Sequence, residues 1–101
     1  MWHHHAMTLE IAIFDITEGE EEAFIDAYHR ARHLVDETDG CREARMTRGV
    51  ESPSRFVLLV EWDSVASHQA FRDGEGFREW RGHIGPPHFA APPVVEHFED
   101  V

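Results

Sequence analysis

The sequence predicts an α+β domain of the ferredoxin-like type, with a four-stranded antiparallel sheet and the element order βαββαβ. Three features of the chain lead to this prediction. An apolar strand ends in Trp62 and turns at once into a helix that Asp63 or Ser64 would cap. A second apolar strand pattern closes the chain at 94–99. A long amphipathic helix lies upstream of both strands.

The first half of the chain supplies a strand, a helix and a second strand. The strand at 8–16 is apolar on both faces, which is typical of a central, covered strand. Residues 17–20 have capping-box spacing and open a helix with one apolar stripe that runs to about Thr38. Asp39 and Gly40 stop this helix, and the more polar strand at 41–47 would lie nearer a sheet edge.

The second half supplies the remaining strands and helices. The loop at 48–54 connects a hairpin whose second strand covers 55–63. A helix at 65–73 follows, and after a break at 73–76 a short third helix carries Phe77, Trp80 and Ile84 at helical spacing. The turn at 85–87 contains two prolines and ends this helix, and a loop then leads to the last strand at 94–99.

The predicted sheet has a second apolar face that its own helices would not cover. A face of this kind favours association, and the economical solution is a second copy packed sheet to sheet. We therefore expect a homodimer, which makes the fold a dimeric α/β barrel. A ligand pocket would lie between the sheet and the helices, or inside the dimer.

Composition limits the partners and the compartment. One domain is expected at 8–101, and the opening 1–7, with three consecutive histidines, is interpreted as a tag-like or disordered leader. The net charge of −11 argues against nucleic acid as a partner. No apolar run is long enough for a membrane span and no secretion signal is visible, so we expect a cytoplasmic protein without a membrane partner.

Several familiar types of site are not indicated. The single cysteine, Cys41, excludes an intrachain disulfide and is interpreted as a small buried hydrophobe. No glycine-rich phosphate loop, paired-cysteine motif or nucleophile elbow occurs. His29 and His33 have the i, i+4 spacing of metal ligands but fall opposite the apolar stripe of their helix, so no metal site is expected.

Four short segments carry a resemblance to a known family. They are the strand leading into 19–24, the run 39–41, the run 62–64 with His68 and 71–72, and the ending 93–98. Together they resemble the antibiotic biosynthesis monooxygenase (ABM) family of dimeric α+β barrels, over roughly 8–101. The resemblance implies a homodimer. In the monooxygenase members it implies oxygen insertion into polycyclic phenols, anthrones or quinols without flavin, haem or metal.

A second branch of the same family degrades haem. That branch uses an Asn on the first strand, a Trp on the second helix, and a following His as the iron ligand. An ungapped pairing places Ala12, Phe71 and Arg81 at these positions, with His83 two residues beyond the last. Two of the three residues are lost and the third is displaced, so haem degradation is disfavoured.

Three histidines are candidate general bases, because imidazole changes its protonation near neutral pH. His68 lies one helical turn before Phe71 and shares its face, while His83 and His88 flank the rigid turn at 85–87. A structural role remains the alternative for each of them: a hydrogen-bonded helix histidine for His68, and solvated loop residues for His83 and His88. His97 alternates with Phe98, so one of the two would face the helices or the dimer.

Aromatic side chains in several elements could form a slot for a flat ring, and Arg72 and Arg81 could stabilise an oxyanion there. A place on the helix surface is the alternative for both arginines. The candidate substrate-binding residues are Phe14, Trp62, Phe71, Trp80, Phe89 and Arg81. Packing in the core is the alternative for each aromatic residue. The indole N–H groups of Trp62 and Trp80 require an acceptor, which favours the rim of a pocket.

The leading hypothesis is a cofactor-independent monooxygenase that oxidises an aromatic small molecule of the polycyclic phenol or quinol type with O2. The rival is a non-catalytic dimer that binds a small hydrophobic ligand or a partner protein. Haem binding is the third alternative. The sequence leaves the substrate and the base open.

Overall fold

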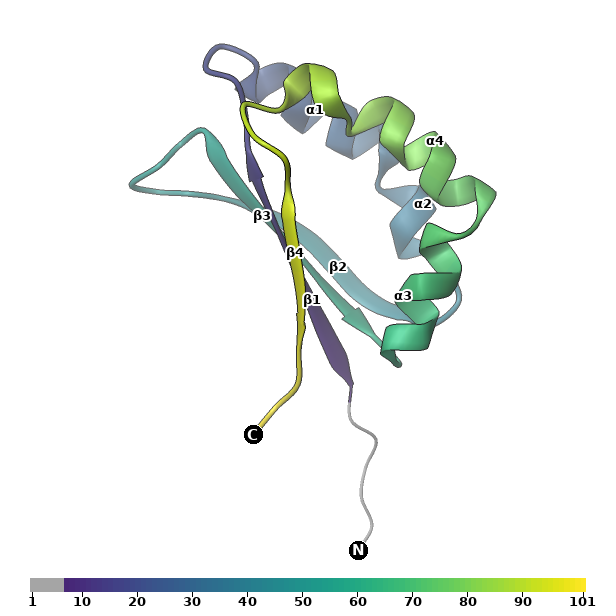
Figure 1. The fold of residues 1–101 in the computed structure, drawn as a ribbon. Coiled ribbons are helices and arrows are strands. Elements are labelled where there is room, and N and C mark those ends of the chain that lie inside the picture. The colour runs from purple at the N-terminus through teal and green to yellow at the C-terminus, as the bar shows by residue number, and fades with distance from the viewer. Residues whose placement is uncertain (1–6) are drawn as a thin grey trace, which may run out of the picture.

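The computed structural model describes residues 7–101, so the predicted leader lies outside the described residues except for Met7. Its antiparallel sheet contains β1 (Thr8–Asp15), β2 (Cys41–Arg48), β3 (Arg55–Trp62) and β4 (Val94–Phe98), in the order β2-β3-β1-β4. The helices are α1 (Glu21–Ala31), α2 (His33–Asp36), α3 (Val65–Arg72), α4 (Glu75–His83) and the 3-10 turn η1 (Pro86–His88). Figure 1 shows α1 to α4 on one side of the sheet. The predicted ferredoxin-like βαββαβ fold is confirmed.

The strands β1 and β3 form the centre of the sheet, and β2 and β4 are its edges, as the sequence predicts for the first two strands. Their register brings alternate side chains onto the face that the helices cover. Thr8 lies opposite Trp62, Ala12 opposite Leu58, and the chain of pairs continues to Phe14 and Phe56. The sheet side of the core therefore consists of Ala12, Phe14, Phe56, Leu58, Val60 and Trp62, all buried.

Helix α1 buries its predicted stripe but begins differently from the prediction. Its buried residues Phe24, Ala27, Tyr28 and Ala31 recur at three and four positions and pack on the sheet. The predicted capping box is wrong: Glu20 is itself the N-cap and makes no side-chain cap, while the Glu21 carboxylate accepts the Gly19 N–H at 2.8 Å.

The predicted single helix to Thr38 is also corrected, because it is divided at Arg32 into α1 and α2. Arg32 itself keeps right-handed helical angles. The segment then ends at Asp36. Beyond it the Thr38 hydroxyl donates to the Leu34 carbonyl at 2.6 Å, and Gly40 adopts a positive φ that closes the turn into β2.

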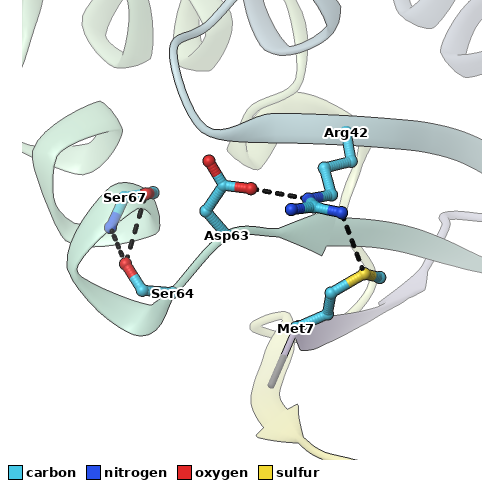
Figure 2. A network of polar contacts seen from close by, with 5 residues as sticks. All are labelled: Met7, Arg42, Asp63, Ser64 and Ser67. Carbon is cyan, nitrogen blue, oxygen red and sulfur yellow. Dashed lines mark hydrogen bonds and ion pairs between the residues drawn. The ribbon is translucent and has the colours of Figure 1, made fainter. Parts of the chain in front are cut away.

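The connection from β3 to α3 fixes the position of the helix that carries His68. The Ser64 hydroxyl accepts the Ser67 N–H at 3.2 Å, which is the predicted N-cap. The preceding Asp63 pairs with Arg42 of β2 at 2.6 Å, and the Arg42 guanidinium also approaches the sulfur of Met7 (Figure 2). The end of β3, the start of β2 and the start of β1 are thus joined where α3 begins.

The face of the sheet opposite the helices is apolar along the two central strands. Its half-buried residues include Leu9, Ile11, Ile13, Val57 and Leu59. On the edge strand β4 the same face presents Val94, which is 60% exposed, and Phe98, which is 43% exposed. No element within residues 7–101 lies over this face (Figure 1), and the predicted homodimer stays a prediction.

Three further expectations concern the cysteine, two histidines of the first helical segment, and membrane-spanning helices. Cys41 is half-buried, and burial raises the pKa of its thiol to about 11, so it is a thiol and not a thiolate near neutral pH. His29 and His33 are both exposed, as predicted. Within the part of the chain that the structure describes, no helix is long and apolar enough to cross a membrane.

Candidate functional site

A cavity of about 810 Å³ lies between the covered face of the sheet and the second half of the chain. Strands β1 and β3 form its floor, helices α3 and α4 form one wall, and the segment 84–93 with the start of β4 forms the other. Its volume is within the range of small-molecule sites. Most of its surface is apolar, with six aromatic side chains: Phe14, Trp62, Phe71, Phe77, Trp80 and Phe89.

The structure brings most of the predicted site residues together around this cavity. All six predicted substrate-binding residues line it, and so does His68. Trp62 and Trp80 are buried at 0% and 5% exposure, so they lie inside the cavity, in its floor and wall, and not at the predicted rim. These residues come from five segments of the chain, β1, β3, α3, α4 and 84–93, and they meet at one cavity. Their role in binding a substrate stays a prediction.

His83 and His88 do not belong to this group. Neither side chain lines the cavity. The 3-10 turn after Gly85 directs His88 toward α1, where its ring lies 6.0 Å from that of Phe24 and its Nδ1 atom lies 3.6 Å from the Glu20 carboxylate. His83 lies half-buried at the end of α4. We therefore retain neither as a candidate base.

The polar centre of the cavity is a group that the sequence prediction only partly includes. Glu10 of β1 is buried at 6% exposure, and its Oε1 accepts the indole N–H of Trp62 at 2.9 Å. The His68 Nε2 atom lies 3.4 Å from the same oxygen. The His68 ring also stacks on the Trp62 indole, with centroids 5.1 Å apart and planes 11° apart. Trp62 thus positions both the carboxyl group and the imidazole.

His97 of β4 extends this group toward the sheet edge. Its Nε2 atom lies 2.7 Å from His68 Nδ1, a short hydrogen bond in which one of the two nitrogens donates. The register explains the contact, because His97 pairs with Glu10 across β1 and β4 and therefore points to the helix side. His97 is half-buried and does not line the cavity. Glu10, His68 and His97, here called the buried relay, run from the cavity to an edge strand.

Burial shifts the pKa values of Glu10 and His68 in opposite directions. Burial raises the pKa of Glu10 above 4.5, although the Trp62 hydrogen bond and the positive charge of Arg72 oppose the shift. Burial, with smaller contributions from the neighbouring His97 and Arg72, lowers the pKa of His68 from 6.5 to about 4. A proton delivered to this pair is therefore held more firmly on the Glu10 carboxylate than on the His68 imidazole.

Sequence reasoning missed Glu10, although a signal for it existed. Glu10 lies two residues before Ala12 and four before Phe14, so strand periodicity places it on the buried face of a central strand. An ionisable residue in that register is uncommon and points to a functional or paired group. The contact of His97 had no such local signal, because it depends on the register between the first and last strands.

No metal centre is indicated by the arrangement. Within residues 7–101, no group of three or more His, Cys, Asp or Glu side chains is placed to hold a metal ion. The chemistry available at the cavity is therefore that of an apolar aromatic chamber with one carboxyl group, one imidazole and two arginines, Arg72 and Arg81, in its lining.

Comparison with known proteins relates this arrangement to a family. The uncharacterized protein YczJ of Bacillus subtilis is 33% identical over 97 residues, covering 94% of this chain and all of that protein. A crystal structure of a Bordetella bronchiseptica protein named for the ABM family is 36% identical, with a TM-score of 0.88, and covers 95% of this chain and 98% of its own.

A second solved structure extends the likeness of the fold to lower identity. The Nitrosomonas europaea protein, named for the same family, has a TM-score of 0.86 at 17% identity over 100% of this chain and 96% of its own. Residues 7–82 of this chain match the family described as antibiotic biosynthesis monooxygenase, which is most of the sequence. The chain belongs to the antibiotic biosynthesis monooxygenase family.

Proposed function

We propose that the protein is a cofactor-independent monooxygenase that oxidises a flat aromatic small molecule of the polycyclic phenol, anthrone or quinol type with O2. The observation that carries the proposal is the buried relay in the wall of an aromatic cavity of about 810 Å³. A chamber of this kind suits a planar ring system, and a carboxyl group inside it is available for proton transfer.

The reaction requires little from the protein beyond binding and a base. With an anthrone, removal of a proton from the ring methylene gives an electron-rich enolate, which transfers an electron to O2. The resulting carbon radical and superoxide combine to a peroxide anion, which takes up a proton to give the hydroperoxide, and loss of water leaves a carbonyl. The methylene carbon loses four electrons, and O2 gains four as it becomes the carbonyl oxygen and water. The apolar lining would exclude bulk water around the enolate.

The proposed base is Glu10, with His68 and His97 as the path for the proton. A carboxylate whose pKa is raised by burial is a stronger base than an ordinary one, whereas the lowered pKa of His68 makes it a weaker one. From Glu10 the proton would pass to His68 Nε2, and the proton on Nδ1 would move to His97 at the sheet edge. This assignment replaces the three histidines that the sequence suggests.

The test is turnover of dihydroxyanthracene, anthrone and naphthoquinol substrates, with and without oxygen. We expect a quinone product in air and none under argon. Glu10→Gln keeps the shape and the Trp62 hydrogen bond but removes the base, so kcat should fall by about 10²–10⁴-fold. The kcat of His68→Gln should fall less, because the Glu10 carboxylate remains as the base.

Two control variants address the alternative bases. His83→Gln and His88→Gln should keep wild-type turnover, because neither side chain lines the cavity. Full activity in Glu10→Gln with a loss in either control would refute the assignment of the base. Tight binding of these aromatics without any oxygen-dependent product would refute the monooxygenase proposal and favour a binding protein for hydrophobic ligands.

A further inference from the structure

The distribution of positive charge around the cavity differs from that of the rest of the chain. The chain has nine arginines, no lysine and a net charge of −11. Five arginines lie within 4.0 Å of a carboxylate, either a few residues away along a helical segment or on another part of the chain: Arg32, Arg42, Arg48, Arg55 and Arg78. Among residues 7–101, Arg30, Arg45, Arg72 and Arg81 have no such carboxylate partner, and of these four only Arg72 and Arg81 line the cavity.

The two arginines lie where a ligand would enter. Arg72 is the last residue of α3, and Arg81 lies in the last turn of α4. Both side chains belong to exposed residues, so they stand at the opening and not in the buried floor. The Arg81 guanidinium lies 5.9 Å from the centre of the Phe77 ring, a cation–π contact that holds it against the cavity wall.

The acids of the cavity do not neutralise this pair. Of the residues within 7–101 that line the cavity, Glu10 is the single acid, and burial raises its pKa. The charge of Arg72 reaches Glu10 and His68 from the opening, since it lowers the pKa of both. The lining therefore carries up to two positive charges and at most one negative charge.

We propose that the ligand of this cavity carries an anionic substituent, a carboxylate or a group of similar chemistry, that Arg72 and Arg81 bind at the opening while the ring occupies the aromatic chamber. This rests on the proposed function, because it specifies the substrate class for the same cavity. Guanidinium groups suit planar anions because each presents a fork of N–H donors. Most of a surface with net charge −11 repels an anion. The two arginines would attract it locally, at the opening of the cavity.

The experiment compares two ligands that differ in one charge and cannot react with O2. Anthraquinone-2-carboxylate and anthraquinone-2-carboxamide are already oxidised, and their binding can be followed by quenching of Trp62 and Trp80 fluorescence or by calorimetry. We expect the wild-type protein to bind the carboxylate about 10-fold more tightly than the amide. The preference should fall as salt is raised from 20 mM to 500 mM.

The variants test whether the two arginines cause the preference. Arg72→Gln and Arg81→Gln should each reduce it by about 3-fold or more, while leaving the affinity for the amide within 2-fold, which also shows that the cavity is folded. Arg78→Gln is the matched control, because it removes the same charge from α4 but pairs with Glu75 and does not line the cavity. It should keep the wild-type preference.

Three results would overturn the inference: equal affinity for both ligands in the wild type, equal loss of preference in all three variants, or no binding of either ligand. The outcome is separable from that of the monooxygenase test because no oxygen is consumed. A carboxylate preference without turnover of any quinol would refute only the proposed reaction. Turnover of neutral quinols without a carboxylate preference would refute only this inference.

Discussion

Burial and two basic neighbours, His97 and Arg72, discourage the protonation of His68. The Trp62 ring covers one face, His97 lies at 2.7 Å, and burial lowers the pKa of the imidazole to about 4. The unfolded chain binds this proton with a pKa near 6.5, so it holds more protons than the folded chain between pH 4 and 6.5. The contribution of His68 to stability is therefore complete above pH 6.5 and is lost as pH falls toward 4. Glu10 has a raised pKa and acts in the opposite sense, because its contribution to stability is lost as pH rises above 4.5.

We predict that His68→Gln makes the free energy of unfolding less dependent on pH. Between pH 6.5 and 4 the wild type should lose up to about 3 kcal/mol more than the variant, which has no imidazole to protonate. Urea unfolding at half-unit pH steps measures the difference, and comparing the two proteins removes most of the opposing effect of Glu10. His29→Gln is the control, because its side chain is exposed. Parallel curves for the wild type and His68→Gln would contradict the prediction.

At the level of elements, the position of α3 depends on a close approach by the turn before β2. Gly40 has φ of +87°, and its carbonyl accepts the Asp63 N–H at 2.8 Å, so it joins β2 to the end of β3. A Cβ atom at Gly40 would lie 2.6 Å from the Cβ of Ser67, in the first turn of α3. Ser67 is held there by its backbone bond to Ser64, which Figure 2 shows. The first turn of the helix that carries His68 therefore packs directly against Gly40, where a larger residue would not fit.

We predict that Gly40→Ala lowers the free energy of unfolding by about 2–4 kcal/mol, through the positive φ and the contact with Ser67 together. Gly19→Ala is the matched control, because Gly19 has φ of +97° but no atom within 4 Å of an added Cβ. The free energy of unfolding of Gly19→Ala should fall by only about 1–2 kcal/mol. Urea denaturation of both variants measures the difference. Equal losses would show that backbone strain, and not the approach to α3, decides the cost.

The elements also show what could be predicted from the sequence. The core stripe of α1 and the central place of β1 followed from periodicity, which is a local property of the chain. The aromatic lining of the cavity followed in part, because buried aromatic residues on facing elements converge. The predicted cap of α1 was wrong, since the Glu20 N–H donates to the Thr17 carbonyl in a turn and the helix begins only at Glu21. The direction of His88 had no local signal, because the fold of a proline-containing turn, and not a repeat, decides it. The buried relay needed the pairing of β1 with β4, which no local pattern encodes.

At the level of the whole molecule, the helices shield only one of two apolar sheet faces. On the other face Ile11 of β1 lies directly opposite Leu59 of β3, and Val94 of β4 lies beside Ile13. Exposed apolar surface of this extent favours association. We propose that a second copy of the chain covers it, through a two-fold contact in which the same strands meet. The helices and the cavity then stay on the outer sides of the pair.

We predict that the wild-type protein has twice the monomer mass in light scattering at micromolar concentration, and that charge on the open face dissociates it. Leu59→Asp should yield monomers, because two carboxylates would be buried against apolar strands in each dimer.

Val94→Asp serves as the second variant, since this side chain is 60% exposed within one protomer and its replacement should not unfold the chain. Val50→Asp, at a position 86% exposed between β2 and β3, is the control and should remain dimeric. Circular dichroism reports whether each variant is folded. A monomeric wild type, or folded Leu59→Asp and Val94→Asp variants that both remain dimers, would show that this face is not the contact.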